Sequence, residues 1–124
     1  MISDYRLFYW NGIQGRGEFV RLAFEDAGIA YDDVGRHDEQ ELMRVLEPSL
    51  ESLTPFALPV LHHHNGNDVV VVAHSAAILH YVAPRIGVIP DNEASRMRAH
   101  QLQLTITDLL AEAHDTHHPI ALSA

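Results

Sequence analysis

The sequence predicts an α/β domain in which a βαβ unit and a ββα unit share one four-stranded mixed sheet, followed by a long helix. Three observations carry this prediction. Short apolar strands alternate with segments of helical period over residues 1–86. An Asn-Gly pair at 65–66 is typical of a tight hairpin between two strands. A final segment from Asp91 to about His117 has helical spacing throughout.

The first unit is predicted as strand, helix, strand. Aromatic residues dominate 5–10 and favour a strand, which Asn11-Gly12 and Gly15 interrupt. A helical period begins at Arg16, and Gly28 is placed to end the helix. Residues 29–34 predict a short second strand. The buried face of the helix is expected to carry Phe19, Leu22, Ala23 and Ala27, widened by Val20 and Phe24.

The second unit is predicted as a hairpin followed by a helix. A weaker helical pattern covers 38–46, and a loop bounded by two prolines covers 47–55. Residues 59–64 and 68–73 predict antiparallel strands, and Ser75 is placed to cap a helix that runs to about Ile86. Pro84 is expected to end or kink its last turn. This order of elements predicts a thioredoxin-like domain over 1–86.

The last helical segment carries apolar residues on more than one face. A surface helix normally buries one apolar stripe, and residues 1–124 offer nothing to cover a second face. We therefore expect 87–124 to form a linker and the first helix of an incomplete all-α domain, completed by a partner subunit or by further sequence. The stripe is Leu102, Ile106, Leu109, Leu110 and Ala113, and Met97 and Leu104 lie off it.

Composition excludes several classes of function. The 124 residues carry 17 Asp and Glu against 8 Lys and Arg, a net charge of −9, which disfavours nucleic acid and anionic membranes as partners. The chain has no cysteine, so disulfides, thiolate metal sites and a cysteine nucleophile are excluded. Any thiol chemistry must use a thiol from a ligand. With no evident signal peptide and no long apolar run, a cytoplasmic location is expected.

Three motifs, in order and spacing, resemble cytosolic glutathione transferases. They are Tyr9-Trp10-Asn11 followed by Gly15-Arg16-Gly17-Glu18, Pro55-Phe56-Ala57-Leu58-Pro59-Val60-Leu61, and Ala73-His74-Ser75-Ala76-Ala77-Ile78-Leu79-His80-Tyr81. The chain looks most similar to Tyr-type, bacterial-like members. The resemblance covers the thioredoxin-like domain and the first helix of the second domain, so the chain is expected to be truncated relative to the family.

The resemblance implies roles for six residues. Tyr9 would stabilise the thiolate of glutathione, the co-substrate, for attack on a small hydrophobic electrophile. Leu58 would pair its main chain with the peptide beside a cis-Pro59. Ser75, with His74 beside it, would hold the γ-glutamyl carboxylate at a helix start. Asp108 would reach across a homodimer to the γ-glutamyl amine.

Four of these six residues also have a purely structural interpretation. Tyr9 could be a core aromatic, Pro59 an ordinary trans proline and Ser75 only an N-cap. Asp108 could be a solvated acid. For Arg16, a salt bridge at the helix start is favoured slightly over an active-site cation. A non-catalytic module that binds glutathione or a protein is the alternative function.

The sequence holds 10 histidines. His62, His63 and His64 alternate faces in a strand, so they cannot converge on one ion. His114 and His118 are i, i+4 neighbours and a candidate zinc pair, but no clear third ligand accompanies them. No metal is therefore expected, although a metal-responsive, histidine-rich protein remains a third hypothesis.

Overall fold

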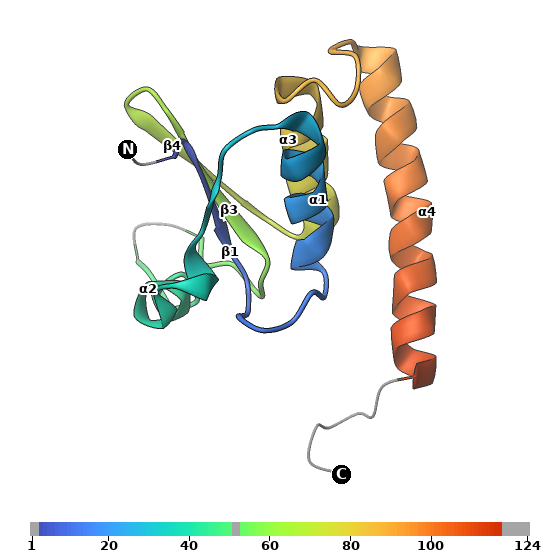
Figure 1. Cartoon of the computed structure of the whole chain (residues 1–124). Helices are drawn as coiled ribbons and strands as arrows, with labels where there is room; N and C mark the ends of the chain where they lie inside the picture. The colour runs from blue at the N-terminus through green and yellow to red at the C-terminus, as the bar shows by residue number, and fades with distance from the viewer. Residues whose placement is uncertain (1–2, 51–52, 118–124) are drawn as a thin grey trace.

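The computed structural model describes residues 3–50 and 53–117 and has the predicted four-stranded mixed sheet (Figure 1). The strands are β1 (Tyr5–Phe8), β2 (Asp32–Asp33), β3 (Val60–Asn65) and β4 (Asp68–Ala73), in the order β2-β1-β3-β4. β1 pairs with β2 in parallel and with β3 antiparallel, and β3 pairs antiparallel with β4 across the predicted Asn-Gly turn. The predicted fold class is confirmed.

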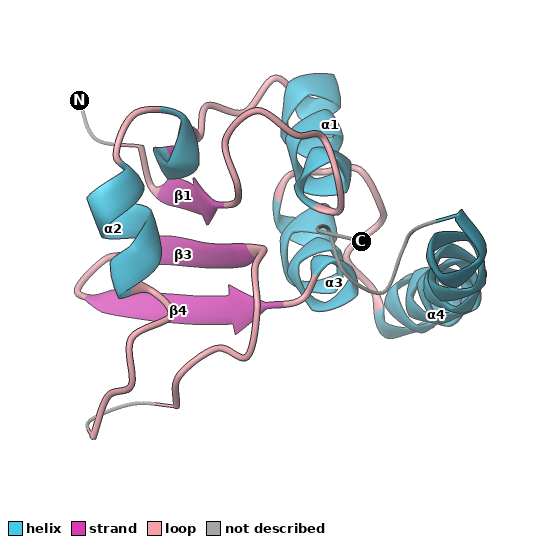
Figure 2. Ribbon diagram, turned by 90° about the horizontal axis from the view of Figure 1, so that it is seen from below, coloured by secondary structure: helices cyan, strands magenta, loops and turns pink. Residues whose placement is uncertain are grey.

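Helices cover both faces of the sheet. Helices α1 (Gly17–Ala27) and α3 (Ser75–Arg85) lie together on one face, and the short α2 (Glu39–Arg44) lies on the other, after the 3-10 turn η1 (Val34–Arg36) (Figure 1). Helix α4 (Glu93–His117) runs on the far side of α3 from the sheet (Figure 2). The two-sided cover explains why the central strands are apolar at successive residues.

Alternation along the central strands creates two cores. Leu7 of β1 and Leu61 of β3 point to the α1–α3 side, while Phe8 and Val60 point to the α2 side. The larger core is made of Leu7, Val20, Phe24, Leu61, Ile78 and Val82, and the smaller one of Phe8, Val34, Leu42 and Val60.

Two of the predicted strands are shorter than expected. β1 ends at Phe8 rather than at residue 10, because its partner strand begins at Val60, after a proline that has no N–H to donate. The second strand shrinks to two residues and continues into the 3-10 turn η1. The predicted stop of α1 is confirmed, since Gly28 has φ 67° and its N–H bonds back to the last turn.

The buried face of α1 differs from the predicted one. Val20, Arg21 and Phe24 are buried, whereas Phe19 and Leu22 are 37% and 58% exposed. The prediction that Phe19 and Leu22 lie at the centre of the buried face is wrong. The physical reason is that acidic partners neutralise Arg21, so a charged residue occupies a position that hydropathy assigns to the surface.

Helix α4 packs on α3 but buries none of its described residues. Its apolar residues Leu102, Leu104, Ile106 and Leu109 are 49–63% exposed, so apolar side chains on more than one face lack cover within the described chain. The domain boundary near residue 86 stays a prediction. Among the described helices, none has the length and apolar character needed to cross a membrane.

Two histidines of β3 are expected to make the free energy of unfolding depend on pH. His62 packs on Phe8, and His63 stacks on Tyr5 and shares a 2.6 Å hydrogen bond with the Tyr81 hydroxyl. Desolvation lowers the pKa of both histidines. Because their folded pKa lies below the unfolded value, the unfolded chain binds more protons as pH falls from about 6.5. Stability is therefore expected to fall from pH 8 to 5.5.

Urea denaturation at pH 8 and 5.5 tests this expectation. The double variant His62→Asn/His63→Asn should show a smaller pH dependence of the free energy of unfolding than the wild type. The variant His64→Asn, at the exposed end of the same strand, should keep the wild-type dependence. A hydrogen bond to Asp32 raises the pKa of His37, so His37 favours folding as the pH falls. This opposite contribution is the same in the wild type and in both variants. An equal pH dependence in all three would contradict the assignment to His62 and His63.

Candidate functional site

Three strand ends meet at one edge of the sheet. Phe8, the last residue of β1, pairs with Val60, the first of β3, and Val60 pairs with Ala73, the last of β4. The next residue outward from each strand is therefore Tyr9, Pro59 and His74. The topology brings together three of the predicted site residues, which are far apart in the sequence.

Tyr9 lies under the loop that joins β1 to α1. Its side chain is packed and the residue is only 7% exposed. A Cβ at Gly15 would overlap the phenol oxygen, and a Cβ at Gly17 would overlap the ring. The two glycines of the Gly-Arg-Gly motif thus allow the loop to pack closely over Tyr9. Both positions, two residues apart, contact the Tyr9 side chain and have no room for a Cβ.

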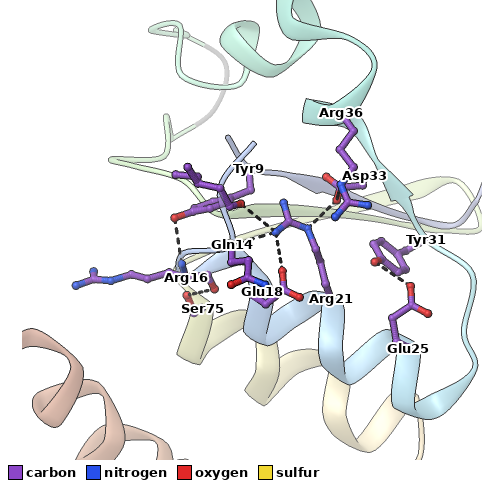
Figure 3. Close-up of polar contacts among 11 residues, drawn as sticks. Tyr9, Gln14, Arg16, Glu18, Arg21, Glu25, Tyr31, Asp33, Arg36 and Ser75 are labelled. Atoms are coloured by element: carbon purple, nitrogen blue, oxygen red, sulfur yellow. Dashed lines mark hydrogen bonds and ion pairs between the residues drawn. The ribbon is translucent and has the colours of Figure 1, made fainter. Parts of the chain in front are cut away.

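The peptide of Arg16 links Tyr9 to Ser75 (Figure 3). The Arg16 N–H donates to the Tyr9 hydroxyl oxygen at 3.0 Å, and the Ser75 hydroxyl donates to the Arg16 carbonyl at 3.1 Å. No residue of 3–50 or 53–117 accepts a hydrogen bond from the phenol. The phenol hydrogen is thus available to donate to a group other than these residues.

Arg21 holds the loop that joins β1 to α1 through its hydrogen bonds. Only 4% exposed, it donates to Asp33 at 2.7 Å and to Glu18 at 3.1 Å. Its guanidinium also contacts the carbonyls of Ile13 and Gln14, and lies 5.6 Å from the centre of the Tyr9 ring. Sequence reasoning missed Arg21. The signal available was an arginine between apolar helix positions, with Asp33 in the next strand.

The start of α3 differs from the predicted cap. His74, not Ser75, is the N-cap, because its Nδ1 accepts from the N–H of Ala76 at 3.2 Å. His74 also has a φ of 80°, which is uncommon for a residue other than glycine. The Ser75 hydroxyl is instead turned toward the α1 loop. The prediction that Ser75 caps the helix is wrong, since the imidazole nitrogen takes that place.

The Leu58–Pro59 segment lies beside His74. Its peptide bond is cis, and the Pro59 carbonyl accepts from the His74 N–H at 3.2 Å. The main-chain N–H and C=O of Leu58 have no hydrogen-bond partner among the described residues. Both groups remain available to an extended peptide.

Two other predicted residues are not joined to this cluster. Asp108 is exposed on α4 and has no polar partner in the described part of the chain, so its role across a dimer stays a prediction. The Arg16 guanidinium forms no ion pair with a described residue and points away from the other side chains in Figure 3. The salt bridge favoured for Arg16 is not formed.

An apolar cleft of about 170 Å³ adjoins Ser75, between α1, α3 and α4. Phe19 forms its α1 side, Ala76 and Leu79 its α3 side, and Ile106 and Leu110 its α4 side. A small apolar molecule fits such a cleft next to the polar cluster.

The predicted histidine groups do not form a metal centre in the described structure. His62 and His63 contact opposite cores, as predicted, and no three His, Asp or Glu side chains within 3–50 and 53–117 are arranged to hold an ion. His118, the proposed partner of His114, lies outside the described residues.

Comparisons with known proteins bear on this site. Glutathione S-transferase 1 of Ascaris suum is 32% identical over 112 residues, which cover 90% of this chain and 49% of that protein. Over nearly all of its length, this chain is thus similar in sequence to one part of a glutathione S-transferase. It spans about half the length of the curated relative it matches. No family model matches the chain.

Solved glutathione S-transferases have the same fold. The Ascaris lumbricoides protein superimposes with a TM-score of 0.67 at 30% identity, covering 91% of this chain and 50% of that one. A Caenorhabditis elegans protein gives 0.64 at 27%, covering 92% and 51%. These glutathione S-transferases come from nematodes.

Proposed function

We propose that this chain binds glutathione at the sheet edge and promotes attack of its thiolate on small hydrophobic electrophiles. The observation that carries the proposal is the link from Tyr9 through the Arg16 peptide to Ser75. It places a phenol with a free hydrogen and a helix start at one site, in a chain that has no thiol of its own.

Tyr9 supplies the chemical step. A phenol that donates to a thiolate lowers the pKa of the bound thiol and raises the fraction of nucleophile at neutral pH. The Arg16 N–H already occupies one lone pair of the phenol oxygen, so the remaining strong interaction of that hydroxyl is donation. Attack then forms a carbon–sulfur bond and expels the leaving group of the electrophile.

The peptide is held by groups around Tyr9. The unpaired N–H and C=O of Leu58 bind the backbone of the tripeptide as an added strand does, with Pro59 holding that segment against His74. The N-terminus of α3 at Ser75 receives a carboxylate, because the free N–H groups and the helix dipole favour negative charge. His74 caps this helix start, because its Nδ1 accepts a hydrogen bond from the Ala76 N–H.

The electrophile and a second subunit complete the proposal. The apolar cleft beside Ser75 accepts the electrophile. A homodimer would cover apolar side chains that the single chain leaves open: Phe56 is 102% exposed on its loop, and Leu109 is 63% exposed on α4. Asp108 would then act from the partner chain, as the resemblance implies.

Glutathione titration by calorimetry, run with light scattering for the mass, tests the proposal. Ser75→Ala removes the hydrogen bond from the Ser75 hydroxyl to the Arg16 carbonyl, which joins the start of α3 to the loop over Tyr9, and it is expected to weaken glutathione binding by roughly 5-fold, the value of one neutral hydrogen bond. Ser95→Ala, on exposed α4, is the matched control and should bind as the wild type does. A wild-type chain that shows no saturable binding would overturn the proposal.

The non-catalytic module is the second candidate, favoured by one observation. On one of its sides the cleft beside Ser75 is formed by α4 alone. The described residues of α4 are all at least partly exposed. A site this open holds an electrophile weakly. Saturable glutathione binding without conjugation of any aryl halide would favour this candidate over the transferase.

A further inference from the structure

The outer edge of β4 has no partner strand in the described part of the chain. β4 is the last strand in the order β2-β1-β3-β4, and Figure 2 shows it outermost in the sheet. It has four consecutive valines at 69–72 and pairs with β3 without a bulge. Edge strands are usually protected from pairing with other chains by a charged residue, a proline or a bulge. Residues 69–73 carry none of these.

The ladder between β3 and β4 fixes which residues turn their main chain to this edge. In an antiparallel pair, residues that bond to each other alternate with residues that do not. The His64 N–H donates to the Asp4 carbonyl at 2.8 Å, on the side of β1, so His64 and its partner Val69 are not bonded to each other. The same alternation applies to Val71 and Ala73. The N–H and C=O groups of these three β4 residues therefore point outward, without a hydrogen bond to any described residue.

We propose that β4 pairs antiparallel with β4 of a second copy of this chain, across a twofold axis at Val71. This register places Val71 opposite Val71, and Val69 opposite Ala73 of the other copy. All three outward-facing residues of each copy then meet one another, so every outward N–H meets an outward C=O. The two four-stranded sheets join into one continuous sheet. The contact is independent of glutathione and leaves α4 uncovered.

The apolar side chains fit this pairing. Val69 and Val71 are 49% and 50% exposed, and Ala73 packs against the core on the α2 face. Val71 and Ala73 line an open groove of about 590 Å³ beside Phe56. The register places Val69 of the second copy next to Ala73, whose small side chain leaves room in this groove. Association thus removes apolar side chains from water, which stabilises the pair.

Charge also favours this register. Residues 69–73 have no charged side chain, so two copies meet without repulsion between like charges. Asp68 of one copy lies opposite His74 of the other. Because Nδ1 of His74 accepts from the Ala76 N–H, the proton of the neutral imidazole is on Nε2, which can donate to a carboxylate. The register thus places an acceptor opposite a donor at each end of the paired strands.

The molecular mass, measured by light scattering over a concentration series without glutathione, tests the pairing. Val71→Pro removes one outward N–H, and a proline is tolerated in an edge strand where that N–H faces solvent. This variant is expected to reach half the mass of the wild type. Val71→Thr keeps the N–H and the β-branched side chain, so it is the matched control and should reach the wild-type mass. Equal masses in the wild type and Val71→Pro, whether both are monomers or both associate through α4, would overturn the proposal.

A second measurement on the wild type removes the dependence on variant folding. Amide hydrogen exchange, followed residue by residue by NMR, should show slow exchange at Val69, Val71 and Ala73 at high protein concentration and faster exchange on dilution. The amides of Val70 and Val72 bond to β3 within one chain, so their exchange should not change with concentration. Outward-facing amides that exchange rapidly at every concentration would refute the pairing, even if glutathione binds normally.

Discussion

Replacing Arg21 with methionine is expected to destabilise the fold by about 3–5 kcal/mol, the cost of breaking a buried ion pair on one side. Asp33 is only 9% exposed, and one of its carboxylate oxygens already lacks a partner. Without Arg21, Arg36 is the one ion-pair partner that the described residues leave to Asp33, and the Arg36 side chain is 60% exposed. The carbonyls of Ile13 and Gln14 lose their donor as well, so the loop over Tyr9 should loosen.

Arg36→Met is the matched control, because it removes the other arginine of the same carboxylate from an exposed position. Exposed ion pairs contribute about 0–1 kcal/mol, so this variant should stay close to the wild type. Urea denaturation followed by circular dichroism gives both free energies of unfolding. Equal losses in the two variants would show that burial of Arg21 does not set its contribution.

The fold could be predicted because its signals are local. Alternating apolar residues, the Asn-Gly turn and the stop at Gly28 each act within a few residues, and the structure has all of them. The buried face of α1 depends on Arg21 finding Asp33, which comes from a later strand. Hydropathy assigns a charge to the surface and cannot register a partner that tertiary folding supplies.

The candidate site, too, was predictable where its signals are local and not where they depend on tertiary contacts. Motif order pointed to Tyr9, Pro59 and Ser75, and the strand register explains why they share an edge. The links between them run through main-chain atoms of Arg16, which no side-chain pattern reveals.

Tyr9→Phe is expected to lower kcat/KM for conjugation of an aryl halide about 10- to 100-fold at neutral pH, the effect of one hydrogen bond to an anion. Glutathione affinity should change little, because Leu58 and Ser75 hold the peptide and the phenol acts on sulfur. The variant keeps the ring under the loop, but the Arg16 N–H loses its acceptor. Its stability must therefore be measured alongside its activity.

The pH profile separates a chemical role of Tyr9 from a structural one. Above about pH 9, free thiols are ionised without help, so the deficit of Tyr9→Phe should shrink there if the phenol stabilises the thiolate. A deficit that stays constant with pH would instead indicate a displaced loop. Tyr31→Phe is the matched control, since it removes a phenol that donates to Glu25 away from the site, and it should follow the wild-type profile.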